Sequence, residues 1–189
     1  SFDVEERQIC GLIGPNGAGK TTMFNCISGI YRPNEGLVRF GGQEITHLPR
    51  HRMTELGIGR TFQNLALFRS MTVRENVLAG AHVTGHSGFI ANAFRSATAR
   101  REEAQSALRA EELLGLLGLR PVADIPVAAL PFGTQKRVEM ARALISRPKL
   151  LLLDEPAGGL NHEEVDALAE LLREVRHSFD LSILLVEHH

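Results

Sequence analysis

The sequence predicts an α/β fold in which a mostly parallel sheet is interrupted by a helical segment. Three observations support this prediction. Residues 9–13 form a short apolar run, read as a buried strand, that leads through a glycine-rich turn into a helical pattern. The four leucines at 150–153 and the apolar run at 182–187 are typical of strands that a parallel sheet buries on both faces. Residues 72–118, in contrast, show helical periodicity.

The first third of the chain contains predicted elements in a regular order. A helix over residues 22–30 follows the glycine-rich turn and stops before Pro33. Residues 36–42 alternate in polarity and end in a Gly-Gly turn, which indicates a small antiparallel hairpin. Residues 57–62 predict a strand that runs into a loop at Gln63.

The middle of the chain is predicted to be mainly helical. Thr72 and Glu75 have the spacing of a capping box, which marks the start of a helix. Residues 100–117 form a charged, Ala- and Leu-rich amphipathic helix. The turn-rich residues 84–88 are expected to form a loop.

The last third returns to alternating helices and strands. Residues 133–147 predict a helix that ends at Pro148. Asn161 is the expected cap of a further helix, because Glu164 stands three positions later. Residues 182–187 form the last predicted strand.

Composition narrows the class of protein. A chain of 189 residues fits one domain, or one domain that carries a subdomain. Its formal net charge of −1 gives no basic surface for nucleic acid, so no nucleic-acid partner is expected. Cys10 and Cys26 are expected to be small buried side chains in a reducing compartment, without a disulfide. No apolar run approaches the roughly 20 residues that a membrane-spanning helix needs.

Residues 14–21 match the phosphate-binding pattern G-x-x-x-x-G-K-[ST] between a predicted strand and a predicted helix. Glycines let successive backbone N–H groups point at a triphosphate, and the helix N-terminus adds partial positive charge. Lys20 is expected to reach the β- and γ-phosphates, and the Thr21 hydroxyl to bind Mg²⁺. The residues of this predicted nucleotide site are Gly14, Pro15, Asn16, Gly17, Ala18, Gly19, Lys20, Thr21 and Thr22.

Two carboxylates, Asp154 and Glu155, follow the leucine strand directly. In an open α/β sheet, ligands bind outside the carboxyl ends of the strands, which is where these acids emerge. Asp154 is therefore expected to hold the Mg²⁺ shell and Glu155 to polarise the attacking water. A solvated acidic turn is the alternative, but the glycine loop elsewhere in the chain favours the site.

The order and spacing of these motifs resemble the ATP-binding cassette of ABC transporters over essentially the whole chain. The matching positions are the glycine loop, Gln63, residues 130–135, Asp154 with Glu155, and His188. Within this family the chain looks most like the ATP-binding subunits of high-affinity branched-chain amino acid importers. The stretches that carry the narrower likeness are residues 57–64, 71–76, 130–133 and 186–189. Urea and amide importers have similar ATPases and remain an alternative.

The resemblance implies a single nucleotide-binding domain over residues 1–189. Residues 1–64 and 138–189 would form a P-loop NTPase core of the RecA-like kind. Residues 65–137 would form a helical subdomain that carries the signature motif. Only 13 residues precede Gly14, so the chain is expected to be truncated at both ends and to lack the aromatic residue that stacks on adenine. ATP affinity in this form is therefore expected to be low.

The resemblance also assigns roles to individual residues. Gln63 would contact Mg²⁺ and the attacking water, and His188 the γ-phosphate, with Glu155 as the third catalytic residue. A frayed chain end is the plainer reading of His188, although the strand before it favours the switch role. Gly133 and Gln135 would act in trans, capping ATP bound to a partner cassette.

The signature segment departs from most cassettes at two positions. Pro131 and Phe132 stand where Ser and Gly are usual. Without the serine hydroxyl, phosphate contact would fall to the backbone near Gly133 and to the helix dipole. The importers that the chain resembles share this variant, so hydrolysis is still expected.

The resemblance further implies cofactors and partners. ATP and Mg²⁺ would be bound, and closure of two cassettes on ATP would drive transmembrane permease subunits. A solute-binding protein would deliver the solute to those subunits. The second cassette could be a copy of this chain or a sibling ATPase. The chain would lie in the cytoplasm, on the inner face of the membrane. Residues 65–69, two positions after Gln63, fit either a core segment or a docking groove for the permease.

Three other classes of protein compete with this interpretation. ABC ATPases outside transport usually carry two cassettes or long coiled-coil insertions, and neither is present in this sequence. A GTPase should show an Asn-Lys-x-Asp motif, which the sequence lacks. A module that binds nucleotide without hydrolysis is disfavoured by the intact Lys20, Asp154 and Glu155.

Overall fold

The computed structural model describes residues 2–61, 66–81 and 97–187. The chain divides into two compact units, which we call the core unit (Ser1–Asn64 and Arg147–His189) and the helical unit (Leu65–Ser146). The division expected at residues 137 and 138 falls inside a helix, α6 (Phe132–Leu144), which belongs entirely to the helical unit.

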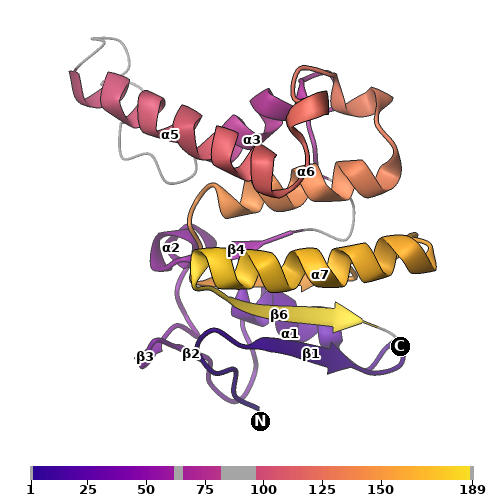
Figure 1. Ribbon diagram of the computed structural model, residues 1–189. Coiled ribbons are helices and arrows are strands. Elements are labelled where there is room, and N and C mark those ends of the chain that lie inside the picture. The colour runs from indigo at the N-terminus through magenta and orange to yellow at the C-terminus, as the bar shows by residue number, and fades with distance from the viewer. Residues whose placement is uncertain (1, 62–65, 82–96, 188–189) are drawn as a thin grey trace. The chain divides into compact units, whose positions relative to one another are not determined.

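A four-stranded parallel sheet forms the centre of the core unit (Figure 1). The strands are β1 (Ile9–Ile13), β4 (Ile58–Arg60), β5 (Leu150–Asp154) and β6 (Ser182–Glu187). Neighbours pair in parallel in the order β1-β6-β5-β4. The predicted α/β class with a mostly parallel sheet is therefore confirmed.

The register of the sheet aligns the ends of three strands. Ile13 pairs with Glu187 across β1 and β6, and Asp154 pairs with Val186 across β5 and β6. Parallel strands bring their carboxyl ends to one edge, so the loops after β1, β5 and β6 begin side by side.

β1 was expected to be buried, and this expectation is wrong: none of its five residues is fully buried, and Gly11 and Ile13 are exposed. The Ile13 side chain is 66% exposed. Among the described residues β1 pairs only with β6, so it lies at the edge of the sheet and one side of it lacks cover. Cys10 in this strand and Cys26 in the following helix are free thiols, and both are half-buried instead of fully buried.

Two helices cover opposite faces of the sheet, α1 (Lys20–Ile27) on one and α7 (His162–Phe179) on the other (Figure 1). Right-handed crossovers require this arrangement, because the chain moves in opposite directions across the sheet after β1 and after β5. The α1 side chain Phe24 is completely buried in one apolar cluster with Leu152 and Val186. That packing fixes α1 to the strands that carry the proposed site.

α1 begins and ends earlier than predicted. The expected helix ran from residue 22 to 30, whereas the observed one starts at Lys20 and stops at Ile27. Gly19 turns the chain into the helix with a φ of 87°, and Gly29 turns it out with a φ of 69°. Both values lie in the left-handed region that favours glycine.

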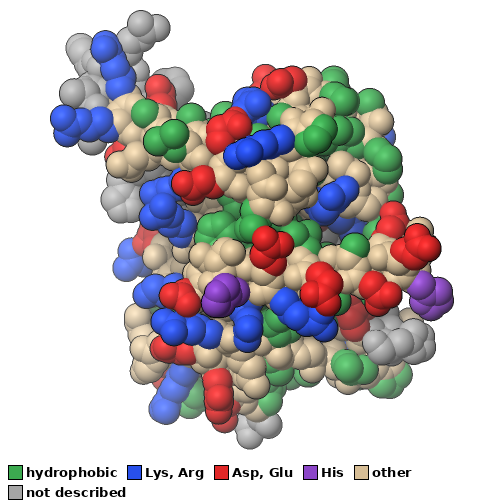
Figure 2. Space-filling model, viewed as in Figure 1, with side chains coloured by type: hydrophobic (Ala, Val, Ile, Leu, Met, Phe, Trp, Pro, Cys, Tyr) green, Lys and Arg blue, Asp and Glu red, His purple; other side chains and the backbone are tan. Residues whose placement is uncertain are grey.

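α7 begins at the capping box predicted from the sequence. The Asn161 side chain accepts the Glu164 N–H at 2.9 Å, and the Glu164 carboxylate accepts the Asn161 N–H at 2.9 Å. Charged side chains line the solvent face of the helix in Figure 2, whereas Leu172 and Val175 are buried. The helix is therefore amphipathic, as a helix that covers one face of a sheet should be.

A small hairpin and a short helix complete the core unit. β2 (Arg39–Phe40) and β3 (Gln43–Glu44) pair antiparallel around Gly41 and Gly42, which confirms the predicted hairpin. α2 (Arg50–Leu56) then leads through Gly57 into β4.

In its described residues, the helical unit packs three α-helices around an apolar core. They are α3 (Val73–Ala81), α5 (Ala97–Leu116) and α6, joined by the short 3-10 helices η1 (Arg120–Val122) and η2 (Val127–Ala129). The predicted helices at 100–117 and 133–147 correspond to α5 and α6. The loop predicted at residues 84–88 lies outside the described residues. In the part of the chain that the structure covers, no helix has the length and apolarity to cross a membrane.

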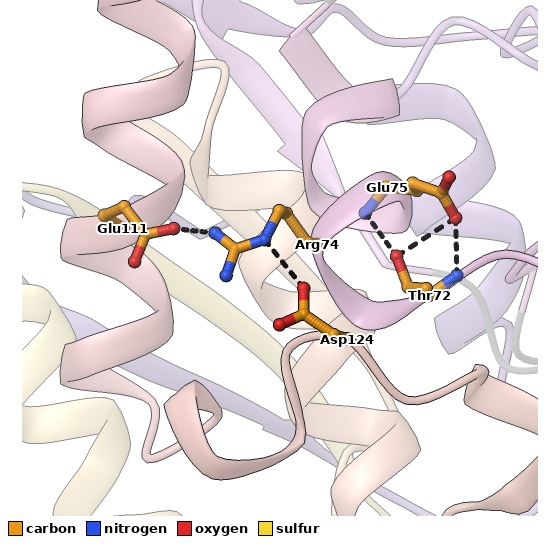
Figure 3. Close-up of polar contacts among 5 residues, drawn as sticks. All are labelled: Thr72, Arg74, Glu75, Glu111 and Asp124. Carbon is orange, nitrogen blue, oxygen red and sulfur yellow. Dashed lines mark hydrogen bonds and ion pairs between the residues drawn. The ribbon is translucent and has the colours of Figure 1, made fainter.

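The start of α3 is held by polar contacts (Figure 3). Thr72 and Glu75 form the predicted capping box, in which the Glu75 N–H donates to Thr72 Oγ1 at 3.2 Å and the Thr72 N–H donates to Glu75 Oε2 at 2.8 Å. Arg74 forms ion pairs with Glu111 on α5 and with Asp124 after η1, the latter at 3.1 Å. These pairs join α3 to both neighbouring segments.

Asn76 and Arg142 fix the loop before α3. The completely buried Asn76 accepts the Phe68 N–H at 2.8 Å, and its amide donates to the carbonyl oxygens of Phe68, Met71 and Thr72. Arg142 Nη1 donates to Ala66 O at 2.5 Å. Burial lowers the pKa of Arg142, and Glu139 opposes this shift. Phe68 stays 51% exposed on this ordered loop.

Gly80 allows α3 and α6 to approach closely. A Cβ at this position would lie 2.1 Å from Arg142 O, a backbone atom that cannot move aside. We predict that Gly80→Ala lowers the free energy of unfolding of the helical unit by about 1–3 kcal/mol, measured by chemical denaturation. Gly115→Ala on α5 is the matched control, because its Cβ would meet only the movable end of Arg120. Equal stability of the two variants would contradict the close approach of α3 and α6.

Candidate nucleotide-binding site

The glycine loop leaves β1 at the sheet edge and enters α1. Gly17 and Gly19 have φ values of 82° and 87°, and a Cβ built on either would meet no atom within 4 Å. Glycine is therefore required here by the backbone conformation and not by lack of space. The loop from Pro15 to Gly19 is exposed, so its N–H groups and the N-terminus of α1 are accessible to an anion.

Lys20 places a positive charge inside this loop. Its side chain is buried, and Nζ donates to Gly14 O at 2.5 Å and to Pro15 O at 2.8 Å. Thr21 and Thr22, in the first turn of α1, are exposed. The loop therefore combines a cation, a helix N-terminus and two accessible hydroxyls, which together suit a polyphosphate.

Asp154 ends β5 at the same edge of the sheet. Its side chain is 1% exposed, and Oδ2 accepts from Arg60 Nη2 at 3.0 Å. The other oxygen, Oδ1, is buried and has no hydrogen-bond partner among the described residues. A buried carboxylate oxygen without a partner is costly, and an outside ligand such as a hydrated cation would supply the missing interaction.

The donor set fits Mg²⁺ better than a metal held by protein alone. The described residues contain no group of three or more His, Cys, Asp or Glu that could hold a metal ion. Mg²⁺ usually binds one or two protein oxygens together with water and substrate phosphates. Asp154 Oδ1 and the Thr21 hydroxyl are oxygens of the required type.

Glu155 follows Asp154 in a left-handed conformation, with a φ of 51°. This conformation is unusual for a residue with a side chain. The Glu155 N–H donates to Val186 O at 3.0 Å, which ties the start of the loop to the end of β6. The acid is thus held at the edge where the glycine loop begins.

A second contact, which the sequence analysis did not anticipate, ties the same loop to β6. Glu187 Oε1 accepts the Ala157 N–H at 2.8 Å. Glu187 is the last residue of β6 and directly precedes His188. The loop after Asp154 and the residue expected to act as the switch histidine are therefore attached to the same strand end.

The signature residues lie on the helical unit. α6 begins at Phe132, one residue before the predicted start, with Gly133 in its first turn. No side chain caps this helix, because Pro131 holds the cap position. Gln135 Nε2 donates to Leu130 O at 2.8 Å, so its amide closes the turn that precedes the helix.

The structure thus brings the glycine loop, Asp154 and Glu155 to one sheet edge. Gln63, His188 and Leu65 lie outside the described residues. The sequence did not predict Arg60 as a site residue, although a single charged residue at the end of an otherwise apolar strand could have indicated it. No sequence pattern pointed to Glu187.

A strand, a glycine loop with lysine and threonine, and an acidic strand end on a parallel sheet define a P-loop nucleoside triphosphatase. Residues 1–158 match the family model for ABC transporters. This chain belongs to the ABC transporter family, as its motifs predicted, and it is an ABC-type ATPase.

Two curated relatives match the whole chain. It is 43% identical over 188 residues to the high-affinity branched-chain amino acid transport ATP-binding protein BraF of Pseudomonas aeruginosa, and covers 74% of that protein. It is 39% identical over 188 residues to the corresponding protein LivG of Escherichia coli K12, again covering 74%.

Solved structures agree with the fold. The ADP conformation of the ATP-binding cassette MJ1267 matches 98% of this chain and 72% of its own, with a TM-score of 0.83 and 31% identity. A dimeric post-hydrolysis state of the cassette MJ0796 bound to ADP and Pi matches 100% of this chain and 78% of its own, with a TM-score of 0.78 and 26% identity.

The contact between Glu187 and Ala157 can be tested by hydrogen exchange. Glu187→Leu removes the acceptor, so we predict that the Ala157 amide exchanges about tenfold faster, since a hydrogen bond to a charged group contributes about 1.5 kcal/mol or more. Glu187→Gln keeps an acceptor oxygen and should leave exchange closer to the wild-type rate. Unchanged protection of Ala157 in the leucine variant would contradict the role of Glu187.

Proposed function

We propose that this chain is the ATP-hydrolysing subunit of an importer for branched-chain amino acids. The transport role is supported by its family, and both the importer class and the substrate are suggested by the names of its relatives in Pseudomonas aeruginosa and Escherichia coli. One structural observation supports the activity above all others. Asp154 has one buried oxygen for which the described part of the chain offers no hydrogen-bond partner, and it ends a strand at the sheet edge where the glycine loop begins.

The glycine loop would bind the triphosphate of ATP. Lys20 would exchange its contacts with Gly14 O and Pro15 O for phosphate oxygens, and the amides at the start of α1 would donate to the same group. Thr21, Asp154 and Gln63 would hold Mg²⁺, which neutralises charge on the β- and γ-phosphates when it is bound.

Glu155 would orient a water molecule and take up its proton as the water oxygen attacks the γ-phosphorus. The bond from the γ-phosphorus to the β,γ-bridging oxygen breaks, which releases ADP and inorganic phosphate. His188 and Gln63 would complete the polar surroundings of the γ-phosphate. Positioning and charge stabilisation account for most of the catalysis in phosphoryl transfer.

A second cassette would supply the other half of each site. Gly133 and the amides of the first turn of α6 would face ATP bound to that partner, with Gln135 holding the turn in place. The dimeric state of the cassette MJ0796 supports such an arrangement. The partner would be a copy of this chain or a sibling ATPase.

The permease subunits would dock on the helical unit. The loop at residues 66–72 presents Phe68 and Met71, which are 51% and 39% exposed, while Asn76 holds the loop rigid. An ordered apolar loop suits a protein partner. The chain would accordingly lie in the cytoplasm at the inner face of the membrane. A solute-binding protein would act on the permease from the opposite side of the membrane.

Glu155→Gln tests the proposed chemistry. We predict that it binds Mg-ATP with near-normal affinity but hydrolyses it about 10²–10⁴-fold more slowly, because an amide cannot accept the proton from water. Phosphate release and equilibrium binding of a fluorescent ATP analogue give the two readouts. Lys20→Ala is the control, since it should lose binding as well. Near-normal turnover of Glu155→Gln would refute the role of Glu155.

Light scattering on the Glu155→Gln variant tests the partner. We predict that Mg-ATP converts the monomer into a dimer and that Mg-ADP does not, because only the γ-phosphate completes the contacts of Gly133 across the interface. A monomer that still binds ATP would contradict pairing of this chain with itself. A sibling ATPase would then have to be the partner.

A further inference from the structure

Arg60, the last residue of β4, is a largely covered cation next to the proposed metal site. Its side chain is 10% exposed and that of Asp154 is 1% exposed, and Nη2 lies 3.0 Å from Oδ2. Removing two charges from water is costly and is repaid only when the geometry is good and further hydrogen bonds are made. The further contacts of Arg60 therefore decide whether the ion pair between Arg60 and Asp154 is well supported.

Three further contacts hold the guanidinium group in place. Nη1 donates to Asn25 Oδ1 at 2.7 Å and to Ser28 Oγ at 2.8 Å. The guanidinium carbon lies 5.7 Å from the centre of the Phe24 ring. The planar fork reaches Asn25, Ser28 and Asp154 from two nitrogens held in a fixed geometry, whereas lysine would have to reach all three from one nitrogen on a flexible stem.

Two partners of Arg60 lie on or at the end of the helix that follows the glycine loop. Asn25 is four positions after Thr21, which puts both on one face of α1, and Ser28 is the C-cap residue, seven positions after Thr21. Arg60 thus connects the helix face that carries Thr21 to the carboxylate of Asp154. Those two residues are the described members of the proposed magnesium site.

The contact also sets which oxygen of Asp154 is used. Arg60 occupies Oδ2, and Oδ1 is the buried atom without a hydrogen-bond partner among the described residues. We propose that Arg60 is a positioning residue for the magnesium site. It fixes the Asp154 carboxylate relative to the Thr21 face of α1 and directs Oδ1 to the metal. This role rests on the proposed function.

Replacing Arg60 removes both a positive charge and the support of the Asp154 carboxylate, and these two losses change the affinity for Mg²⁺ in opposite directions. Loss of a nearby positive charge alone would strengthen the attraction between Asp154 and Mg²⁺. Loss of orientation would weaken it, as happens when residues that support metal ligands are removed. The direction of the change therefore separates the two roles.

The test is equilibrium binding of a fluorescent ATP analogue to the full chain, titrated with Mg²⁺ and repeated in EDTA. For Arg60→Met and Arg60→Lys we expect the Mg²⁺ concentration at half-maximal effect to rise about tenfold. Affinity in EDTA should stay within about twofold of wild type, because the glycine loop is untouched. Arg74→Met is the control, since it breaks two exposed ion pairs within the helical unit and leaves the residues of the proposed site unchanged.

An unchanged or lower Mg²⁺ midpoint in Arg60→Met, or full recovery in Arg60→Lys, would overturn the proposal. A matching loss of affinity in EDTA would also overturn it, because Arg60 would then only support the fold. If the Arg60 variants fail to fold, Asn25→Ala with Ser28→Ala should raise the midpoint by a smaller factor, and no rise would overturn the proposal. If binding of the ATP analogue to the wild-type protein does not depend on Mg²⁺, the metal site of the proposed function is itself refuted.

Discussion

The parallel pairing of β6 with both β1 and β5 is the constraint on which the proposed site depends. Its register places Ile13 beside Glu187 and Val186 beside Asp154. The loops that leave these strands must therefore start together at one edge. If β6 paired one residue out of register, each of its side chains would point to the opposite face of the sheet. The packing of Phe24 on this sheet then holds the start of α1 near the acidic strand end.

The two units carry different parts of an ATPase. The core unit contains the cation, the helix N-terminus and both acids, together with a glycine loop that is exposed from Pro15 to Gly19. The helical unit carries a second helix N-terminus at Gly133 and an ordered apolar loop. This division explains why a cassette should need a second cassette to complete its site and a membrane partner to use the energy of hydrolysis.

Local signals predicted most of the fold, and contacts between distant residues escaped prediction. The glycine pattern around Lys20 and the cap at Asn161 act within a few residues, so the sequence alone revealed them. The exposure of Ile13 did not follow, because an apolar run does not distinguish an edge strand from a central one. Arg60 and Asp154 are 94 positions apart. Their pairing depends on the order of strands, and no spacing rule predicts that order.

The most direct test of the account is a crystal structure of the chain with Mg²⁺ and a non-hydrolysable ATP analogue. We predict a triphosphate against the amides of Gly17–Thr22, with Lys20 turned from its backbone contacts to the phosphates. We also predict Mg²⁺ on the Thr21 hydroxyl, with Asp154 Oδ1 bonded to it directly or through one water. A nucleotide bound elsewhere, or a metal ion remote from Asp154, would contradict the claim that these strand ends form one site.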